Sequence, residues 1–171
     1  MFIFVIYSGL LFSCEPFSSA KFIKNKYADF FKVYKSESGW FVEVLNGDKK
    51  VIAIYSVDVN HSCEGVTKIN SSSSIGLVST TYFPFVDALG MSDSIKAVFE
   101  KRNFFAGSFK KNFVKDLGAN PSVEKIIKTN LSVLFGYSLN NSDKDLFYQL
   151  VRFNYPVFIV HEFLERSPLA K

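Results

Sequence analysis

The chain has 171 residues, of which 48% are hydrophobic, and Phe alone occurs 20 times. This length and apolar content predict a folded domain with a core and exclude wholesale disorder. The 20 Lys and Arg residues against 16 Asp and Glu leave a net charge of +4, and the basic residues are scattered. A nucleic-acid-binding surface needs a concentrated basic stripe, so we expect no nucleic-acid partner.

An apolar run over residues 2–12 opens the sequence. It is too short to cross a bilayer as a helix, which takes about 20 residues, and it is typical of the apolar core of a secretory signal peptide. No Lys or Arg precedes Lys21, although signal peptides begin with basic residues, so we expect the true start to lie upstream. The alternatives are an ordinary secretory signal without lipidation, or a buried strand with a chance cysteine.

The apolar run ends in Leu11-Phe12-Ser13-Cys14, which resembles a bacterial lipobox. That resemblance implies cleavage before Cys14 and lipidation of its sulfur. Cys63, which is the second of two cysteines, would then be unpaired. His61 and Glu64 flank Cys63, but structural zinc takes four ligands and no second cluster is present, so this segment is interpreted as a loop or a strand end.

The residues that follow divide into a tether, 15–20, and a β-rich extension with its loop, 21–70. Alternating apolar residues predict strands at 40–45 and 51–59, and Asn46-Gly47-Asp48 between them is a strong turn signal. These two strands should form a hairpin. A run of four serines, Ser71–Ser74, then predicts a flexible loop.

From residue 71 to 171 the pattern changes to alternating short strands and helices. Apolar runs predict strands at 75–78, 95–99, 131–135 and 157–160, and residues 115–117 are a candidate for one further, very short strand. Helices are predicted after Ser79, Asn120 and Asn141, all residue types that favour N-caps, with Leu89 on an inward face. Such alternation predicts an α/β fold with a parallel sheet flanked by helices.

Ligands of open α/β sheets bind beyond the carboxyl ends of the strands, and polar or aromatic side chains follow the predicted strands here. The candidate ligand-binding residues are Thr80, Thr81, Tyr82, Tyr137, Ser138 and Glu162. They would suit an amphipathic ligand held by stacking and a few hydrogen bonds. No recognised catalytic or metal-site motif is present, so we expect a protein that is not an enzyme and has no cofactor of its own.

Several of these segments resemble the class III periplasmic binding proteins, which serve ABC importers of ferric siderophores, haem and vitamin B12. The resemblance covers about residues 75–171. It rests on VSTTYFPFVDALG at 78–90, VKDLG at 114–118, VEKII at 123–127, LSVLFGY at 131–137 and FLERSPLAK at 163–171. The chain departs from the family at 130–132, where Asn-Leu-Ser replaces a usual Pro-Asp. Residues 21–60 resemble the N-terminal extension of lipoprotein members.

The resemblance implies a Rossmann-like N-terminal lobe that is anchored by lipid on Cys14 at the periplasmic side of a bacterial membrane. It also implies that the protein binds a metal chelate and delivers it to an ABC permease and its ATPase. Asp143, with Asp145 as its neighbour, matches the acidic position that docks to the permease in this family. The family's second lobe would follow the long helix expected after residue 171, so the chain is expected to hold one lobe only. Alternatives are a lipid-anchored interaction module without a small-molecule ligand, and a chelatase-like enzyme of related fold.

Overall fold

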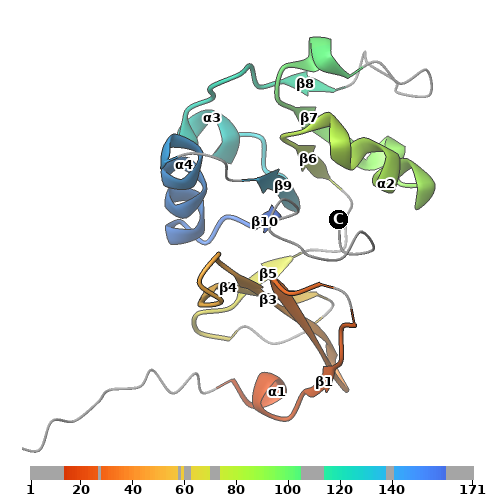
Figure 1. The fold of residues 1–171 in the computed structure, drawn as a ribbon, viewed down its shortest axis with the longest axis vertical. Helices are drawn as coiled ribbons and strands as arrows, with labels where there is room; N and C mark the ends of the chain where they lie inside the picture. Colours follow the sequence, from red (N-terminus) through yellow and green to blue (C-terminus); the bar gives the residue numbers. More distant parts are fainter. Residues whose placement is uncertain are drawn as a thin grey trace, which may run out of the picture.

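The chain folds into two sheets of five strands each, placed one above the other (Figure 1). The structure is a computed structural model that describes residues 14–26, 28–57, 59, 63–69, 74–104, 114–137 and 141–160. The predicted signal peptide core at 2–12 lies outside the described residues. The fold is mixed α/β, with a largely antiparallel sheet followed by a parallel one.

The first sheet is built from the residues predicted to be β-rich. Its strands, in spatial as well as chain order, are β1 (Lys21–Ile23), β2 (Phe31–Ser36), β3 (Gly39–Leu45), β4 (Val51–Val57) and β5 (Thr67–Ile69). The predicted hairpin is confirmed, since β3 and β4 pair antiparallel with Trp40 opposite Val57. The Asn46 carboxamide oxygen fixes its turn by accepting hydrogen bonds from the backbone N–H groups of Asp48 at 3.0 Å and Lys50 at 2.9 Å.

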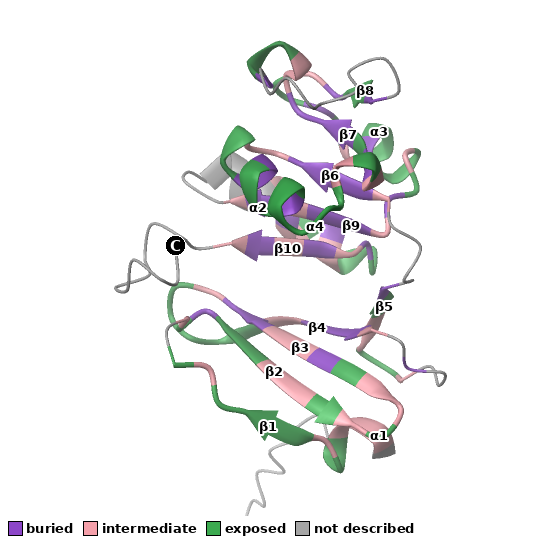
Figure 2. Cartoon of the chain, turned by 90° about the vertical axis from the view of Figure 1, so that its right-hand side faces the viewer, coloured by how far each residue is buried: buried purple, intermediate pink, exposed green. Residues whose placement is uncertain are grey.

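The second sheet confirms the predicted parallel arrangement. It consists of β6 (Ile75–Leu77), β7 (Ile95–Val98), β8 (Lys115–Asp116), β9 (Val133–Tyr137) and β10 (Val157–Val160), in the spatial order β10-β9-β6-β7-β8. Every neighbouring pair is parallel. Strands β6, β7 and β9 are central and largely buried, as their purple segments in Figure 2 show, whereas β10 and β8 form the two edges of the sheet and β8 is exposed.

Helices cover both faces of the parallel sheet (Figure 1). They are α2 (Phe83–Ala88) on one face, α3 (Val123–Ile127) and α4 (Asn141–Arg152) on the other, and the 3-10 turns η1 (Thr80–Tyr82), η2 (Ser92–Ser94) and η3 (Lys101–Asn103) in the loops. The inward position predicted for Leu89 is wrong, because it is 74% exposed. The helix ends at Ala88, and Gly90 with its positive φ of 70° turns the chain away, so Leu89 lies past the last packed turn.

A hydrophobic cluster lies on each face of the parallel sheet. The α2-side cluster includes Leu77, Phe83 and Val86, and the α4-side cluster includes Leu134 and Phe147. On the α4 side the helix approaches the sheet closely because β9 carries Gly136 there. A Cβ at Gly136 would lie 2.7 Å from the Phe147 ring, closer than real Cβ contacts.

The two sheets share one core. Val44, Tyr55 and Ile69 of the first sheet belong to the same buried cluster as Ile75 and Leu77 of the second. The predicted boundary at residue 70 thus separates two sheets, but the hydrophobic core continues across it.

A buried tyrosine also joins the two sheets by hydrogen bonds. The Tyr55 hydroxyl donates to the carbonyl oxygen of Val157 on the edge strand β10 at 2.5 Å, and it accepts from the N–H of the same residue at 3.2 Å. Its ring stacks on Phe158 with the ring centroids 4.9 Å apart. At the outer edge of β10, the backbone groups of Val157 are therefore occupied by a side chain of the first sheet.

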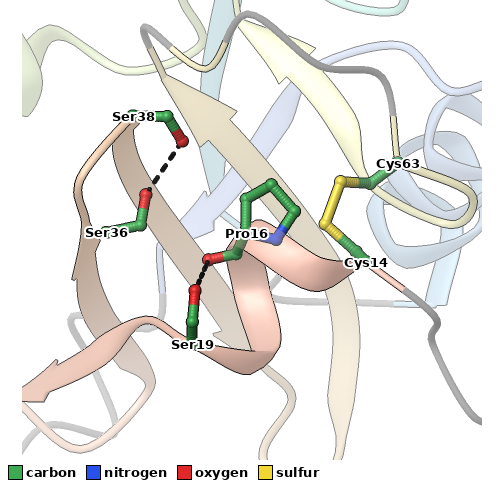
Figure 3. Close-up of a disulfide and its surroundings, with 6 residues drawn as sticks. All are labelled: Cys14, Pro16, Ser19, Ser36, Ser38 and Cys63. Atoms are coloured by element: carbon green, nitrogen blue, oxygen red, sulfur yellow. Dashed lines mark hydrogen bonds between the residues drawn. A yellow bond between two sulfur atoms is a disulfide. The ribbon is translucent and has the colours of Figure 1, made fainter.

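The segment predicted to be a tether instead packs on the first sheet. Residues Glu15–Ser18 form the short helix α1, and the Phe17 ring contacts Tyr34 and Phe41 at centroid distances of 5.2 and 5.1 Å. Cys14, just before this helix, forms a disulfide with Cys63, and their Cα atoms lie 5.2 Å apart (Figure 3).

The disulfide corrects the expectation that Cys63 is unpaired. It also conflicts with lipidation of Cys14, because a cysteine has one sulfur and the disulfide and a lipid thioether would both use it. The two cysteines are 49 residues apart, and their sequence spacing did not reveal that the fold brings them together. None of the described helices combines the length and the hydropathy needed to cross a membrane.

Candidate ligand-binding site

The carboxyl ends of β6 and β9 form the centre of the candidate site. These strands are neighbours and parallel, yet the chain leaves β6 for α2 on one face and leaves β9 for α4 on the opposite face (Figure 1). Divergent connections open a crevice beyond the strand ends, where ligands of open α/β sheets bind. The adjacent strand β10 ends at the same edge.

A cavity of about 520 Å³ lies at this edge, on the face that α4 covers. Its lining comes from the ends of β6, β7 and β9, from the loop after β8 and from α4: Val78, Phe99, Glu100, Ala119, Asn120, Pro121, Tyr137, Leu146 and Phe147. Small-molecule sites typically occupy about 300–1,000 Å³ and combine apolar walls with a few polar groups. The cavity meets both descriptions.

The apolar wall of the cavity is part of the core and is therefore rigid. Phe99 at the end of β7 and Phe147 on α4 are 7% and 1% exposed. Both belong to the α4-side cluster, against which Val78 and Leu146 also pack. Since Gly136 admits the Phe147 ring against β9, the wall is set by core packing.

Glu100 supplies the carboxylate of the site. It lies two residues beyond the end of β7, and its backbone is left-handed, with φ 45° and ψ 67°. Its side chain accepts hydrogen bonds from Arg102 Nη2 at 2.9 Å and from Asn103 Nδ2 at 3.1 Å. The glutamate side chain is 32% exposed, whereas that of Arg102 is 82% exposed.

The loop that carries Asn120 is held by local hydrogen bonds. The Asp116 carboxylate accepts from the N–H of Gly118 at 2.8 Å, and this bond is the main reason why the pKa of Asp116 is lowered. Lys125 Nζ donates to the carbonyl oxygen of Leu117 at 2.7 Å. These bonds fix the path of the chain into the cavity lining.

Asn120 was predicted to cap the following helix, and that prediction is wrong. Ser122 is the N-cap of α3, because its hydroxyl accepts from the N–H of Lys125 at 3.3 Å. The helix starts later than the Asn-Pro pair indicates, so Asn120 and Pro121 lie in the loop and line the cavity.

Comparisons with protein-family models, curated protein sequences and solved structures gave no match. What the site binds is therefore inferred from its own side chains. Within the described ranges, no three His, Cys, Asp or Glu residues gather in a group that could hold a metal ion.

The predicted site residues are divided between the two faces of the sheet. Tyr137 contributes to the cavity lining at the end of β9, although it also packs against the α2-side cluster. Thr80 and Thr81 are exposed in η1, and the Thr81 hydroxyl lies 2.9 Å from that of Ser79. Tyr82 is only 7% exposed and packs near Phe135, so its ring belongs to the core on the α2 side and does not line the cavity.

Other predicted residues cannot be placed in full. Ser138 and Glu162 lie outside the described residues. Asp143 and Asp145 lie in the first turns of α4, and the structure describes their backbone only. Sequence reasoning missed Glu100 and Asn120 as site residues. One sequence signal could have indicated Glu100, namely its place directly after the predicted strand 95–99. None of the predicted site residues lies at the carboxyl end of that strand.

Proposed function

We propose that the chain is an exported solute-binding protein, that its α/β half is a Rossmann-like lobe, and that the cavity at the ends of β6 and β9 holds the solute. The observation that carries the proposal is the position of this cavity. It lies beyond the carboxyl ends of adjacent parallel strands with divergent connections, and it combines aromatic walls with one carboxylate and one carboxamide.

Export is supported by two independent features. The apolar run at 2–12 has the length of a signal peptide core. The Cys14–Cys63 disulfide fits a compartment outside the cytoplasm, where thiols are not kept reduced. We therefore place the disulfide-bonded protein on the outer side of the cytoplasmic membrane. Lipid anchoring through Cys14 would require a form of the chain in which this disulfide is absent.

The resemblance to class III binding proteins extends the proposal to an importer. The partners would be an ABC permease and its ATPase, and the solute an iron–siderophore, haem or cobalamin-type chelate. Asp143 and Asp145 at the start of α4 would dock to the permease. Acidic residues in a first helical turn also stabilise the helix N-terminus, so docking needs a test separate from helix stability.

Blocking the cavity tests the binding proposal. Ala119 is an exposed residue of its lining, and Ala119→Trp should fill part of the cavity without disturbing the core. Ala88→Trp, at an exposed position of α2 on the opposite face, is the matched control. Thermal unfolding of the disulfide-bonded chain would be followed with ferric siderophores, haem, cobalamin and a small-molecule library, because a ligand of the folded state raises Tm.

We expect at least one ligand to raise the Tm of the chain and of Ala88→Trp but not of Ala119→Trp. Ligands that stabilise all three proteins equally would place binding elsewhere and contradict the proposal. A chain that binds nothing in the panel yet is captured by a protein partner would favour the interaction-module alternative.

A further inference from the structure

The described lining of the cavity carries one ionised side chain, and Arg102 pairs with it at 2.9 Å. Among the described lining residues, Glu100 is the ionised side chain, and the others are apolar or neutral. Two lysines in the adjoining loops are engaged elsewhere: Lys101 Nζ donates to the carbonyl oxygen of Val114 at 2.9 Å, and Lys125 Nζ donates to that of Leu117 at 2.7 Å. The Arg102 side chain is 82% exposed and an exposed ion pair is weak, so it balances the carboxylate only in part and an anionic group entering the cavity is still disfavoured.

The Glu100 carboxylate keeps acceptor capacity on both of its oxygens. Arg102 donates to Oε1 and Asn103 donates to Oε2, so each oxygen has one of these protein donors. An ionised carboxylate offers about four lone-pair positions. One position on each oxygen therefore remains for a ligand, and two neighbouring hydroxyl groups on one ligand can use both at once.

The left-handed backbone at Glu100 supports a role in binding. A non-glycine residue with positive φ is uncommon, and Asn, Asp and His are enriched among those that occur. Such strained conformations persist where the surrounding structure fixes them, and they cluster at ligand sites. Here the conformation presents a carboxylate beside the apolar wall of Phe99 and Phe147.

We propose that the cavity selects a neutral, ring-bearing ligand with vicinal hydroxyl groups. The diol donates to the two Glu100 oxygens, the ring lies against the half-buried Val78 and Leu146 side chains of the lining, and the Asn120 carboxamide supplies a further polar contact. The ribose of a nucleoside and a catechol share this chemistry. The inference rests on the proposed solute-binding function and narrows it, because anionic haem or ferric catecholates would be disfavoured.

The test compares diols with their mono-hydroxyl counterparts. The disulfide-bonded chain would be titrated with adenosine and 2′-deoxyadenosine, with catechol and phenol, and with AMP, by isothermal calorimetry. We expect at least one diol to bind at least about tenfold more tightly than its counterpart, since hydrogen bonds to a charged group carry such an effect. The preferred pair identifies the source of the diol, and AMP should bind more weakly than adenosine.

Glu100→Gln keeps the size of the side chain and removes its charge, so it should weaken diol binding about tenfold or more and weaken binding of the mono-hydroxyl ligand less. Glu37→Gln, on the exposed β2–β3 turn, is the matched control. Equal affinity for a diol and its counterpart in both pairs, tighter binding of AMP, or an unaffected Glu100→Gln variant would overturn the inference. If another solute raises the Tm of the parent chain but not of Ala119→Trp, the proposed solute-binding function stands and only the diol inference fails. If no solute shows this difference, both the solute-binding function and the diol inference fail.

Discussion

Glu100 shows how one residue can run against local preference. For an L-residue the left-handed conformation brings Cβ close to the following carbonyl oxygen, which costs roughly 1–2 kcal/mol. Two backbone hydrogen bonds hold Glu100 in this conformation between β7 and η3. The Glu100 N–H donates to the carbonyl oxygen of Gly118 at 3.3 Å, and the Asn103 N–H donates to the carbonyl oxygen of Glu100 at 2.8 Å. A residue chosen only for stability at this position would be glycine.

Replacing Glu100 by Gly and by Ala separates the backbone cost from the loss of the carboxylate. Both variants lose the contacts with Arg102 and Asn103, but only Gly adopts φ 45° without a Cβ clash. We expect Glu100→Gly to be more stable than Glu100→Ala by about 1 kcal/mol. Urea unfolding measures the difference. Equal stabilities would mean that the left-handed conformation at this residue is not strained.

Tyr55 is a second residue whose role depends on one atom. Tyr55→Phe keeps the ring but leaves the buried N–H and carbonyl groups of Val157 without the hydroxyl that joins them. We expect a loss of about 2 kcal/mol of unfolding free energy, because buried polar groups without partners are costly.

The control is Tyr34→Phe, which removes a hydroxyl that donates to Glu43 Oε2 at 3.0 Å in a half-buried place. Glu43 keeps a second partner in Lys32, whose Nζ lies 3.5 Å from the same oxygen, so the loss should be smaller than that of Tyr55→Phe. Both variants would be compared by chemical unfolding at neutral pH. A Tyr55→Phe loss no larger than that of Tyr34→Phe would show that β10 does not depend on the hydroxyl.

At the scale of single elements, apolar runs were reliable guides and helix starts were not. Each predicted strand of the parallel sheet formed, because runs such as 157–160 can be buried on both faces. Helix starts failed where several capping residues stand together. In Asn120-Pro121-Ser122 both Asn and Ser are good N-caps, and the structure uses Ser122. That choice decided whether Asn120 belongs to a helix or to the site.

The packing of α4 on β9 predicts the effect of one added methyl group. In Gly136→Ala the new Cβ would lie 2.7 Å from the Phe147 ring, which is 1% exposed and cannot move into solvent. We expect a loss of about 1–3 kcal/mol from overpacking. In the background Phe147→Leu, where the ring is absent, the same substitution should cost clearly less. Calorimetric unfolding of the four proteins gives this coupling, and additive losses would contradict the contact.

At the scale of the whole molecule, the sequence pointed to two sheets but not to the links between them. Tyr55 reads as one more strand residue, and its bond to Val157 spans 102 positions. In the sequence, Cys63 is typical of a loop cysteine, and the resemblance to a lipobox predicts that Cys14 is lipidated. Such contacts depend on how finished elements dock. The cavity could not be predicted from the sequence for the same reason, because its lining residues come from separate strand ends that meet only in the folded chain.

The disulfide makes the strongest prediction at this scale. It closes a loop of 49 residues, which the chain-entropy model values at about 4 kcal/mol. Cys63→Ser should therefore lose about that much unfolding free energy, and reductant should destabilise the chain but not the variant. If Cys14 instead carries lipid, Cys63→Ser will be as stable as the parent and reductant will have no effect on either.

The contact of Tyr55 with Val157 at the edge of β10 bears on whether other strands can add to the parallel sheet. An uncovered edge strand offers a row of free N–H and carbonyl groups to any passing strand and promotes aggregation. The first sheet therefore hinders strands of other molecules from extending the parallel sheet at β10. A fragment that begins after residue 70 would expose this edge together with the part of the shared core that packs on the first sheet. We expect it to self-associate in size-exclusion chromatography, whereas the whole chain remains monomeric.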